Sequence, residues 1–147
     1  MKNTLCRITG ILALAFLATT QAARAQEAVL ANIPFAFTAG EVTLPAGEYR
    51  VQKVNDDSSP LLIRSTDGNG ASIVMTFAAS ANAPQAKSKL VFNRYGNRYF
   101  LAQVWRAGYS QGRGLPKSAK EKEQALAAHN EAPEQVTIVA RLMASDH

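Results

Sequence analysis

The segment 89–106 constrains the fold most, because two apolar runs meet there at the dipeptide Gly96-Asn97. A glycine in the first position of a two-residue loop favours a type II′ turn, which joins antiparallel strands. A loop of that length also fixes the register of the hairpin. The predicted cross-strand pairs are Tyr95 with Arg98, Arg94 with Tyr99, Phe92 with Leu101, and Leu90 with Gln103.

This register predicts that both faces of the hairpin are apolar. One face carries Leu90, Phe92, Tyr99, Leu101 and Trp105, and the other carries Val91, Tyr95, Phe100, Ala102 and Val104. A strand that is apolar on both faces is normally covered on both sides. We therefore expect the hairpin to form the centre of the domain.

Short apolar runs separated by turn residues precede the hairpin. Proline lacks the backbone donor of a ladder, so the first run, 28–37, reads as an edge or irregular strand because of Pro34. The other predicted elements are a tight turn at 44–47, a strand at 49–54, a second hairpin formed by 61–66 and 71–77 around Asp67-Gly68-Asn69-Gly70, and a loop at 78–86.

The chain after the hairpin contains a glycine-rich loop, 108–116, and then the one convincing helix signal. Ser118 followed three residues later by Glu121 is a capping box, in which each side chain bonds a free amide of the first turn. Good helix formers continue over 119–130, and Pro133 is expected to stop the helix.

The last run, 135–142, alternates apolar and polar residues and predicts a closing strand. The whole pattern gives six or seven strands and one helix, without the strand–helix–strand rhythm of a parallel sheet. We therefore predict a mainly β fold, an antiparallel sandwich or small barrel with one helix near the C-terminus.

The first 25 residues have the order of a secretory signal peptide. Lys2 and Arg7 precede an uncharged apolar core, 8–18, which is shorter than the roughly 20 residues that a membrane-spanning helix needs. Ala23-Arg24-Ala25 then predicts cleavage before Gln26. Residues 26–147 are expected to form a single β-rich domain, exported to the periplasm or the extracellular space and without a transmembrane segment after processing.

Removal of the leader changes the charge and the cysteine count. It takes three of the 16 basic residues and none of the 11 acidic ones, so the net charge falls from +5 to +2. We therefore do not expect nucleic acid as a partner. The one cysteine, Cys6, also lies in the leader, so the mature chain must be held together by core burial without disulfides.

Four segments together resemble a family of small exported proteins of unknown function that is common in acidobacterial genomes. They are Ile33-Pro34-Phe35-Ala36-Phe37, Leu44-Pro45-Ala46-Gly47-Glu48-Tyr49-Arg50-Val51, the hairpin run from Leu90 to Leu101, and Leu115-Pro116-Lys117-Ser118. Their order extends over most of the mature chain. The resemblance implies export and a compact β fold, and it implies no activity and no site residues.

The segment 108–112, Gly-Tyr-Ser-Gln-Gly, matches the G-x-S-x-G pattern of the nucleophile elbow and resembles the version in cutinase-type esterases. An elbow needs a parallel strand before the serine and a helix directly after it. Here the preceding strand belongs to an antiparallel hairpin, and the helix is delayed. An exported serine hydrolase using Ser110 is therefore the alternative function, with Asp146 and His147 or Glu121 and His129 completing the triad.

The remaining chemistry-bearing residues do not form a catalytic set. His129 and His147 are the only histidines, and no cysteine remains after processing, so we expect no transition-metal site, no cofactor and no enzymatic activity.

The candidate binding residues follow the central hairpin: Trp105, Arg106, Tyr109 and Arg113. Aromatic and arginine side chains supply the large contact areas and directional donors of binding hot spots. The predicted function is an exported, non-catalytic envelope or secreted module that binds an unknown protein or small-molecule partner. An outer-membrane barrel is a further alternative, although its strands should be about ten residues long.

Overall fold

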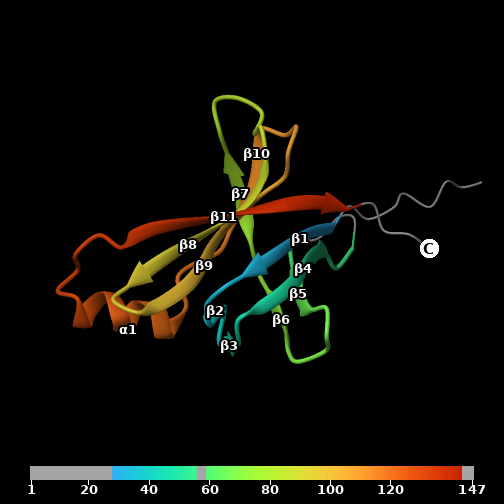
Figure 1. The fold of residues 1–147 in the computed structure, drawn as a ribbon. Coiled ribbons are helices and arrows are strands. Elements are labelled where there is room, and N and C mark those ends of the chain that lie inside the picture. Colours follow the sequence, from blue (N-terminus) through green and yellow to red (C-terminus); the bar gives the residue numbers. More distant parts are fainter. Residues whose placement is uncertain (1–27, 56–58, 144–147) are drawn as a thin grey trace, which may run out of the picture.

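The structure, a computed structural model, describes residues 28–55 and 59–143, which form eleven strands and one helix (Figure 1). The elements are β1 (Ala28–Ile33), β2 (Phe37–Ala39), β3 (Val42–Leu44), β4 (Gly47–Lys53), β5 (Leu61–Ser65), β6 (Ala71–Val74), β7 (Phe77–Ser80), β8 (Ser88–Tyr95), β9 (Arg98–Trp105), β10 (Gln111–Gly114), α1 (Ala119–Ala127) and β11 (Glu134–Met143).

The strands form one sheet that curls into a nearly closed barrel. The hydrogen-bonded order is β3-β2-β9-β8-β11-β1-β4-β5-β6, and β10 pairs with both β7 and β9. The chain runs directly from β6, which pairs with β5, to β7, which pairs with β10, so residues 75–76 connect the two ends of the curled sheet. The buried hydroxyl of Ser72 also donates to the Ala39 carbonyl at 3.0 Å, which joins β6 to the β2–β3 hairpin.

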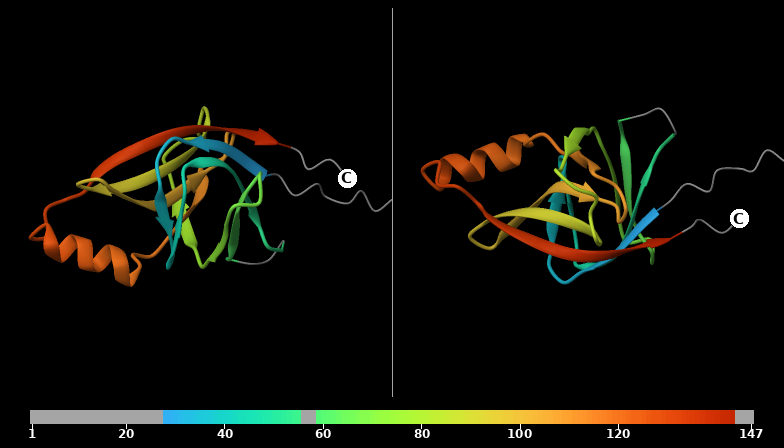
Figure 2. Two further views of the ribbon diagram at one scale, coloured as in Figure 1. Left: turned by 60° about the horizontal axis from the view of Figure 1, so that its bottom comes forward. Right: turned by 90° about the horizontal axis from the view of Figure 1, so that it is seen from above.

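The predicted mainly β fold with one helix near the C-terminus is confirmed. Of the two predicted forms, a sandwich and a small barrel, the sheet takes the barrel-like one. One pairing differs from the antiparallel expectation, because β2 lies parallel to β9 at Thr38 and Phe100. Figure 2 shows α1 outside the curled sheet, beside the β8–β9 hairpin. The helix therefore covers the sheet without entering its interior.

Aromatic side chains fill one part of the barrel interior. We call Phe35, Phe37, Tyr49, Phe92 and Tyr99 the aromatic cluster. Phe35 stacks on Tyr99 with 3.8 Å between ring centres, and Phe92 receives the edges or faces of Phe35 and Phe37 at 5.1 and 5.4 Å. Tyr49 is fully buried, and its hydroxyl donates to the Pro45 carbonyl at 2.6 Å. Edge-to-face packing of this kind stabilises a core beyond simple area burial.

The predicted β8–β9 hairpin is confirmed, including the turn, where Gly96 has a φ of 62°. The register is correct from Tyr95 to Phe92 and wrong beyond it. Val91 lies opposite Gln103, and Leu90 lies opposite Val104, because Ala102 forms a β-bulge. The bulge turns Val104 into the core in place of Gln103.

The bulge also moves Trp105 to the other face of the hairpin. Trp105 lies opposite Lys89, so it does not share the face of Leu90 and Phe92 as the sequence predicted. The physical reason is the two-residue period of a strand: one extra residue reverses the facing of every residue after it.

Three predicted elements need correction. β1 is an interior strand between β11 and β4, because it ends at Ile33 and leaves Pro34 in the connection to β2. The segment predicted as the loop 78–86 contains most of β7, and the glycine-rich loop 108–116 contains β10. These two short strands pair with each other, which single-strand patterns cannot show.

The helix begins as predicted and ends earlier. Ser118 Oγ accepts the amide of Glu121 at 3.1 Å, so half of the capping box is confirmed. The Glu121 carboxylate instead turns inward and accepts from Asn93 Nδ2 at 3.3 Å. The helix ends at Ala127, before the expected stop at Pro133, because His129 and Asn130 have φ values of 53° and 58°, a left-handed conformation that ends helices.

The predicted leader and its cleavage site, residues 1–25, lie outside the described residues, as do Asp146 and His147. Within residues 28–55 and 59–143, no helix is long and apolar enough to cross a membrane.

Candidate functional site: a cationic pocket at one end of the barrel

A cavity of about 120 Å³ lies where β4 and β9 end and β10 begins. We call it the barrel-end pocket. Four buried aliphatic side chains line it from the core: Val29, Val51, Leu61 and Val104. Lys53, Arg106 and Arg113 line it as well. The pocket therefore combines apolar surface with three basic side chains.

Arg113 is held in place by hydrogen bonds to Thr76, in the bend between β6 and β7. Its Nε donates to Thr76 Oγ1 at 2.8 Å, and its Nη2 donates to the Thr76 carbonyl at 3.1 Å. The Thr76 hydroxyl in turn donates to the Ser59 carbonyl. Both acceptors of Arg113 are neutral oxygens, so the guanidinium is positioned while its charge is retained.

Arg106 lies just after β9, and its guanidinium carbon is 4.3 Å from the centre of the Tyr109 ring. This cation–π contact is worth about 0.5–1 kcal/mol at an exposed site. Tyr109 itself is exposed and does not line the pocket. Tyr109 therefore contacts the Arg106 guanidinium from outside the pocket.

Trp105 is buried against the backbone of β10, outside the pocket. Its Nε1 donates to Gln103 Oε1 at 3.0 Å. A Cβ atom at Gly112 would lie 2.6 Å from the Trp105 ring and 2.8 Å from the Val104 carbonyl oxygen. Gly112 is therefore required for close packing, and Trp105 stabilises the wall of the pocket.

Of the four predicted site residues, the structure brings Arg106 and Arg113 to one pocket and leaves Trp105 and Tyr109 beside it. Sequence reasoning missed Lys53 and the aliphatic floor. Lys53 is the last residue of β4, and this strand end lies near β9 and β10 only because the sheet curls. The sequence predicted a strand at 49–54, and its pattern carried no signal for the pocket.

The segment 108–112 has a structural explanation that does not involve nucleophilic catalysis. Ser110 leads directly into strand β10, and β9 runs antiparallel to both β8 and β10, so the strand–turn–helix of an elbow is not formed. Gly108 has a φ of 84°, which favours glycine, and Gly112 packs under Trp105. Both glycines of the pattern are thus explained by the β9–β10 connection and by packing on β9.

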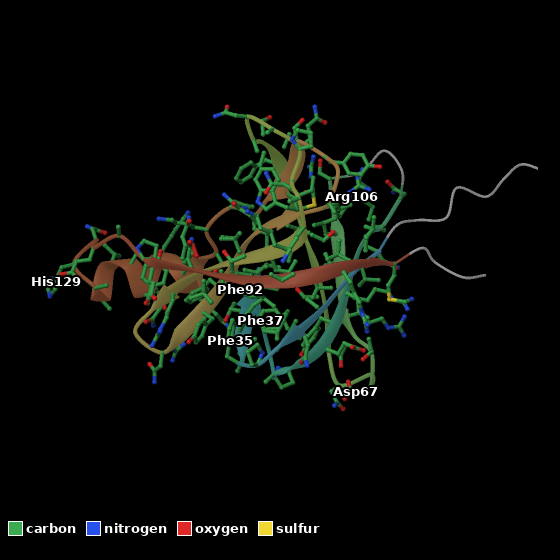
Figure 3. All side chains as sticks on the ribbon, turned by 45° about the horizontal axis from the view of Figure 1, so that its top comes forward. Phe35, Phe37, Asp67, Phe92, Arg106 and His129 are labelled. Carbon is green, nitrogen blue, oxygen red and sulfur yellow. The ribbon has the colours of Figure 1, made fainter. Side chains whose placement is uncertain are left out.

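Of the triad partners considered for Ser110, the two that the structure describes, Glu121 and His129, do not lie around it. Glu121 is in α1, where it faces Asn93, and His129 lies beyond the helix end (Figure 3). The β9–β10 connection lies apart from α1 in Figures 1 and 2. Ser110 instead contributes its carbonyl oxygen, which accepts from the Ala81 amide at 2.8 Å and joins two loops.

Glu121 is the only charged side chain that is buried in the described part of the chain. Burial raises the pKa of its carboxyl, and the hydrogen bond from Asn93 and the charge of Lys117 partly oppose that rise. The nearby Tyr95 hydroxyl is buried without a hydrogen-bond partner among the described residues, and its pKa is raised by burial and by Glu121. This cluster lies under α1 and does not line the barrel-end pocket.

Over residues 28–55 and 59–143, no group of three or more His, Cys, Asp or Glu side chains is placed to hold a metal ion. The comparisons with known proteins give no match: no family model, no curated protein and no solved structure is similar to this chain. The family resemblance of the four sequence segments stays a prediction.

Proposed function

We propose that the protein is an exported, non-catalytic β-barrel module that binds a small ligand in the barrel-end pocket. The observation that carries the proposal is the cavity of about 120 Å³ with an aliphatic floor and three basic side chains. Ligand sites commonly combine mostly apolar walls with a few placed polar groups. Periplasm or extracellular space is the proposed location, on the basis of the leader sequence.

Ala78 offers a direct test, because it lines the pocket and is exposed on β7. Ala78→Phe should fill the mouth of the pocket without disturbing the core. Ala127→Phe, at an exposed position of α1, is the matched control. Binding of a panel of small carboxylates, amines and alcohols is measured by ligand-observed NMR on the mature protein.

At least one probe is expected to bind, with affinity reduced tenfold or more by Ala78→Phe and unchanged by Ala127→Phe. Absence of binding across the panel at millimolar concentration would contradict the proposal. Binding that Ala78→Phe leaves intact would place the site elsewhere and would equally contradict it.

The non-catalytic part of the proposal is tested with Ser110→Ala. The secreted protein and the variant should both leave short-chain p-nitrophenyl esters unhydrolysed above the buffer rate. Hydrolysis by the unaltered protein that disappears in Ser110→Ala would support the serine hydrolase instead.

Export is tested by mass spectrometry of protein recovered from the producing cells and their medium. The expected mature chain begins at Gln26 and is found outside the cytoplasm. A chain that keeps residues 1–25 and stays in the cytoplasm would contradict export.

A further inference from the structure

Among the described residues, the charged side chains that line the barrel-end pocket are all basic. Lys53, Arg106 and Arg113 are its charged members, and no aspartate or glutamate among the described residues lines it. Gln52 and Gln111 add neutral polar side chains to the lining. Like charges close together favour an opposite charge between them, most strongly where the surroundings exclude water.

Arg113 is held in position to donate hydrogen bonds to an anion. Two of the five guanidinium N–H groups are used on Thr76, which fixes the plane of the guanidinium. The planar fork matches a carboxylate or a phosphate oxygen pair better than an ammonium does. Because Thr76 holds the side chain before a ligand arrives, little side-chain entropy remains to be lost on binding.

The size of the cavity limits the size of the part of the ligand that does not carry the charge. A dry apolar cavity of about 150 Å³ accommodates a benzene molecule, and this one measures about 120 Å³. Val29, Val51, Leu61 and Val104 are each buried to at least nine-tenths and supply the apolar contact. An inorganic ion alone would leave this floor in contact with water.

We propose that the barrel-end pocket takes a small organic anion, with its acidic group on Arg113 and Lys53 and an apolar body of about one ring or a short alkyl chain on the aliphatic floor. This inference rests on the proposed function and names the chemical class of its ligand. The acidic group pairs with Arg113 and Lys53, and the apolar body replaces water over the floor.

The test compares benzoate with benzamide, which has the same shape and no charge, and with benzylamine, which is positively charged. Binding to the mature protein is measured by calorimetry at low ionic strength. Benzoate should bind at least tenfold more tightly than benzamide, and benzylamine should not bind. Raising the salt from about 0.05 to 0.5 M should weaken benzoate severalfold and benzamide hardly at all, because salt screens the charge.

Two variants assign the charge to its residues. Arg113→Gln and Lys53→Gln should each weaken benzoate several- to tenfold and leave benzamide unchanged, whereas Arg64→Gln, an exposed arginine of β5, should change neither. Lys53 lies at the end of β4, so its variant tests the inference even if loss of the Thr76 bonds unfolds Arg113→Gln.

The outcomes separate the two proposals. If benzamide or benzylamine binds as tightly as benzoate, and Ala78→Phe abolishes that binding, the pocket binds ligands and the anion inference is wrong. If no probe binds, or if Ala78→Phe changes nothing, the proposed function itself fails. Benzoate binding that survives both Arg113→Gln and Lys53→Gln would also overturn the inference.

Discussion

In one part of the barrel five aromatic rings pack against one another, whereas at the barrel-end pocket valine and leucine side chains surround a cavity of about 120 Å³. Figure 3 shows Phe35, Phe37 and Phe92 gathered together and Arg106 in a separate part of the molecule. None of the aromatic cluster residues lines the pocket. The same sheet thus has a filled part and a hollow part.

The difference arises from single residues on shared strands. In β4, Tyr49 belongs to the aromatic cluster, and Val51, the next inward-facing residue, lines the pocket. Both are buried, and both pair with β1. A step of two residues replaces a phenol ring with an isopropyl group, and the smaller side chain lines the cavity. Side-chain size along one strand therefore differs between the filled part and the hollow part.

The largest expected effect comes from breaking the filled part. Phe92→Ala removes a ring that is fully buried and contacts both Phe35 and Phe37, so we expect a loss of about 3–5 kcal/mol of unfolding free energy. Urea denaturation of the purified variant measures it. Phe77→Ala, where the ring is 53% exposed, is the control, with an expected change below about 0.5 kcal/mol. Equal losses for the two would show that the aromatic cluster is not the centre of stability.

A smaller loss is expected at the wall of the hollow part. Gly112→Ala places a methyl group against the Trp105 ring and the Val104 carbonyl, and neither can move away freely because Trp105 is buried and the carbonyl belongs to the backbone of β9. Overpacking of this kind costs about 1–3 kcal/mol. At Gly114 the group in the way is the exposed Phe77 ring, so Gly114→Ala should cost less. Thermal unfolding of both variants checks the order, and a reversed order would contradict the assigned packing.

Val51→Phe converts the hollow part into a filled one. Because the cavity can receive the added ring, we expect the unfolding free energy of the variant to change by less than the roughly 1–3 kcal/mol of ordinary overpacking. Benzoate binding should be lost. A stable variant that still binds benzoate would show that the ligand does not use the aliphatic floor.

The pH dependence of stability sharpens the comparison of charge, because the buried charged group among the described residues is an acid, Glu121 of α1, whereas the described charged side chains of the pocket are basic. The folded pKa of Glu121 is raised above its ordinary value of 4.5 by burial. Its stabilising contribution is therefore full below that ordinary value and is lost as the pH rises through the folded pKa. Glu121→Gln should therefore show a flatter dependence of unfolding free energy on pH than the unaltered protein as the pH rises above that ordinary value.

The matched control for this experiment is Glu123→Gln, an exposed position of the same helix. It should keep the pH dependence of the unaltered protein in urea titrations at each pH. If Glu121→Gln and Glu123→Gln behave alike, the carboxyl of Glu121 is not held in a water-poor site.

Local patterns predicted the elements that depend on neighbours in sequence. The Gly96 turn, the pairing from Tyr95 to Phe92 and the Ser118 cap follow from short-range chemistry and are present. The hairpin predicted from 61–66 and 71–77 is present too, but its second strand ends at Val74 and Phe77 begins β7. The bulge at Ala102 could not be predicted, because Val104 and Gln103 are exchanged only when the rest of the core demands an apolar residue opposite Leu90.

The candidate site was predictable only in part for a similar reason. Arg106 and Arg113 were predicted as binding residues because they are charged and lie near aromatic residues in the sequence, and both line the pocket. Lys53 and the aliphatic floor come from strands distant in sequence, which meet because the sheet curls back on itself. Trp105 was expected in the binding surface and is instead packed on Gly112, because the bulge reversed its facing.

The central claim, that the ligand site is the hollow and basic end of the barrel, is tested most directly by titrating ¹⁵N-labelled mature protein with benzoate and following the backbone amide signals. The account predicts saturable shifts concentrated at Ala78, Val104, Gly112 and Arg113, with the amides of Phe37 and Phe92 unmoved. Shifts concentrated at the aromatic cluster or on α1, or no shifts at millimolar benzoate, would contradict it.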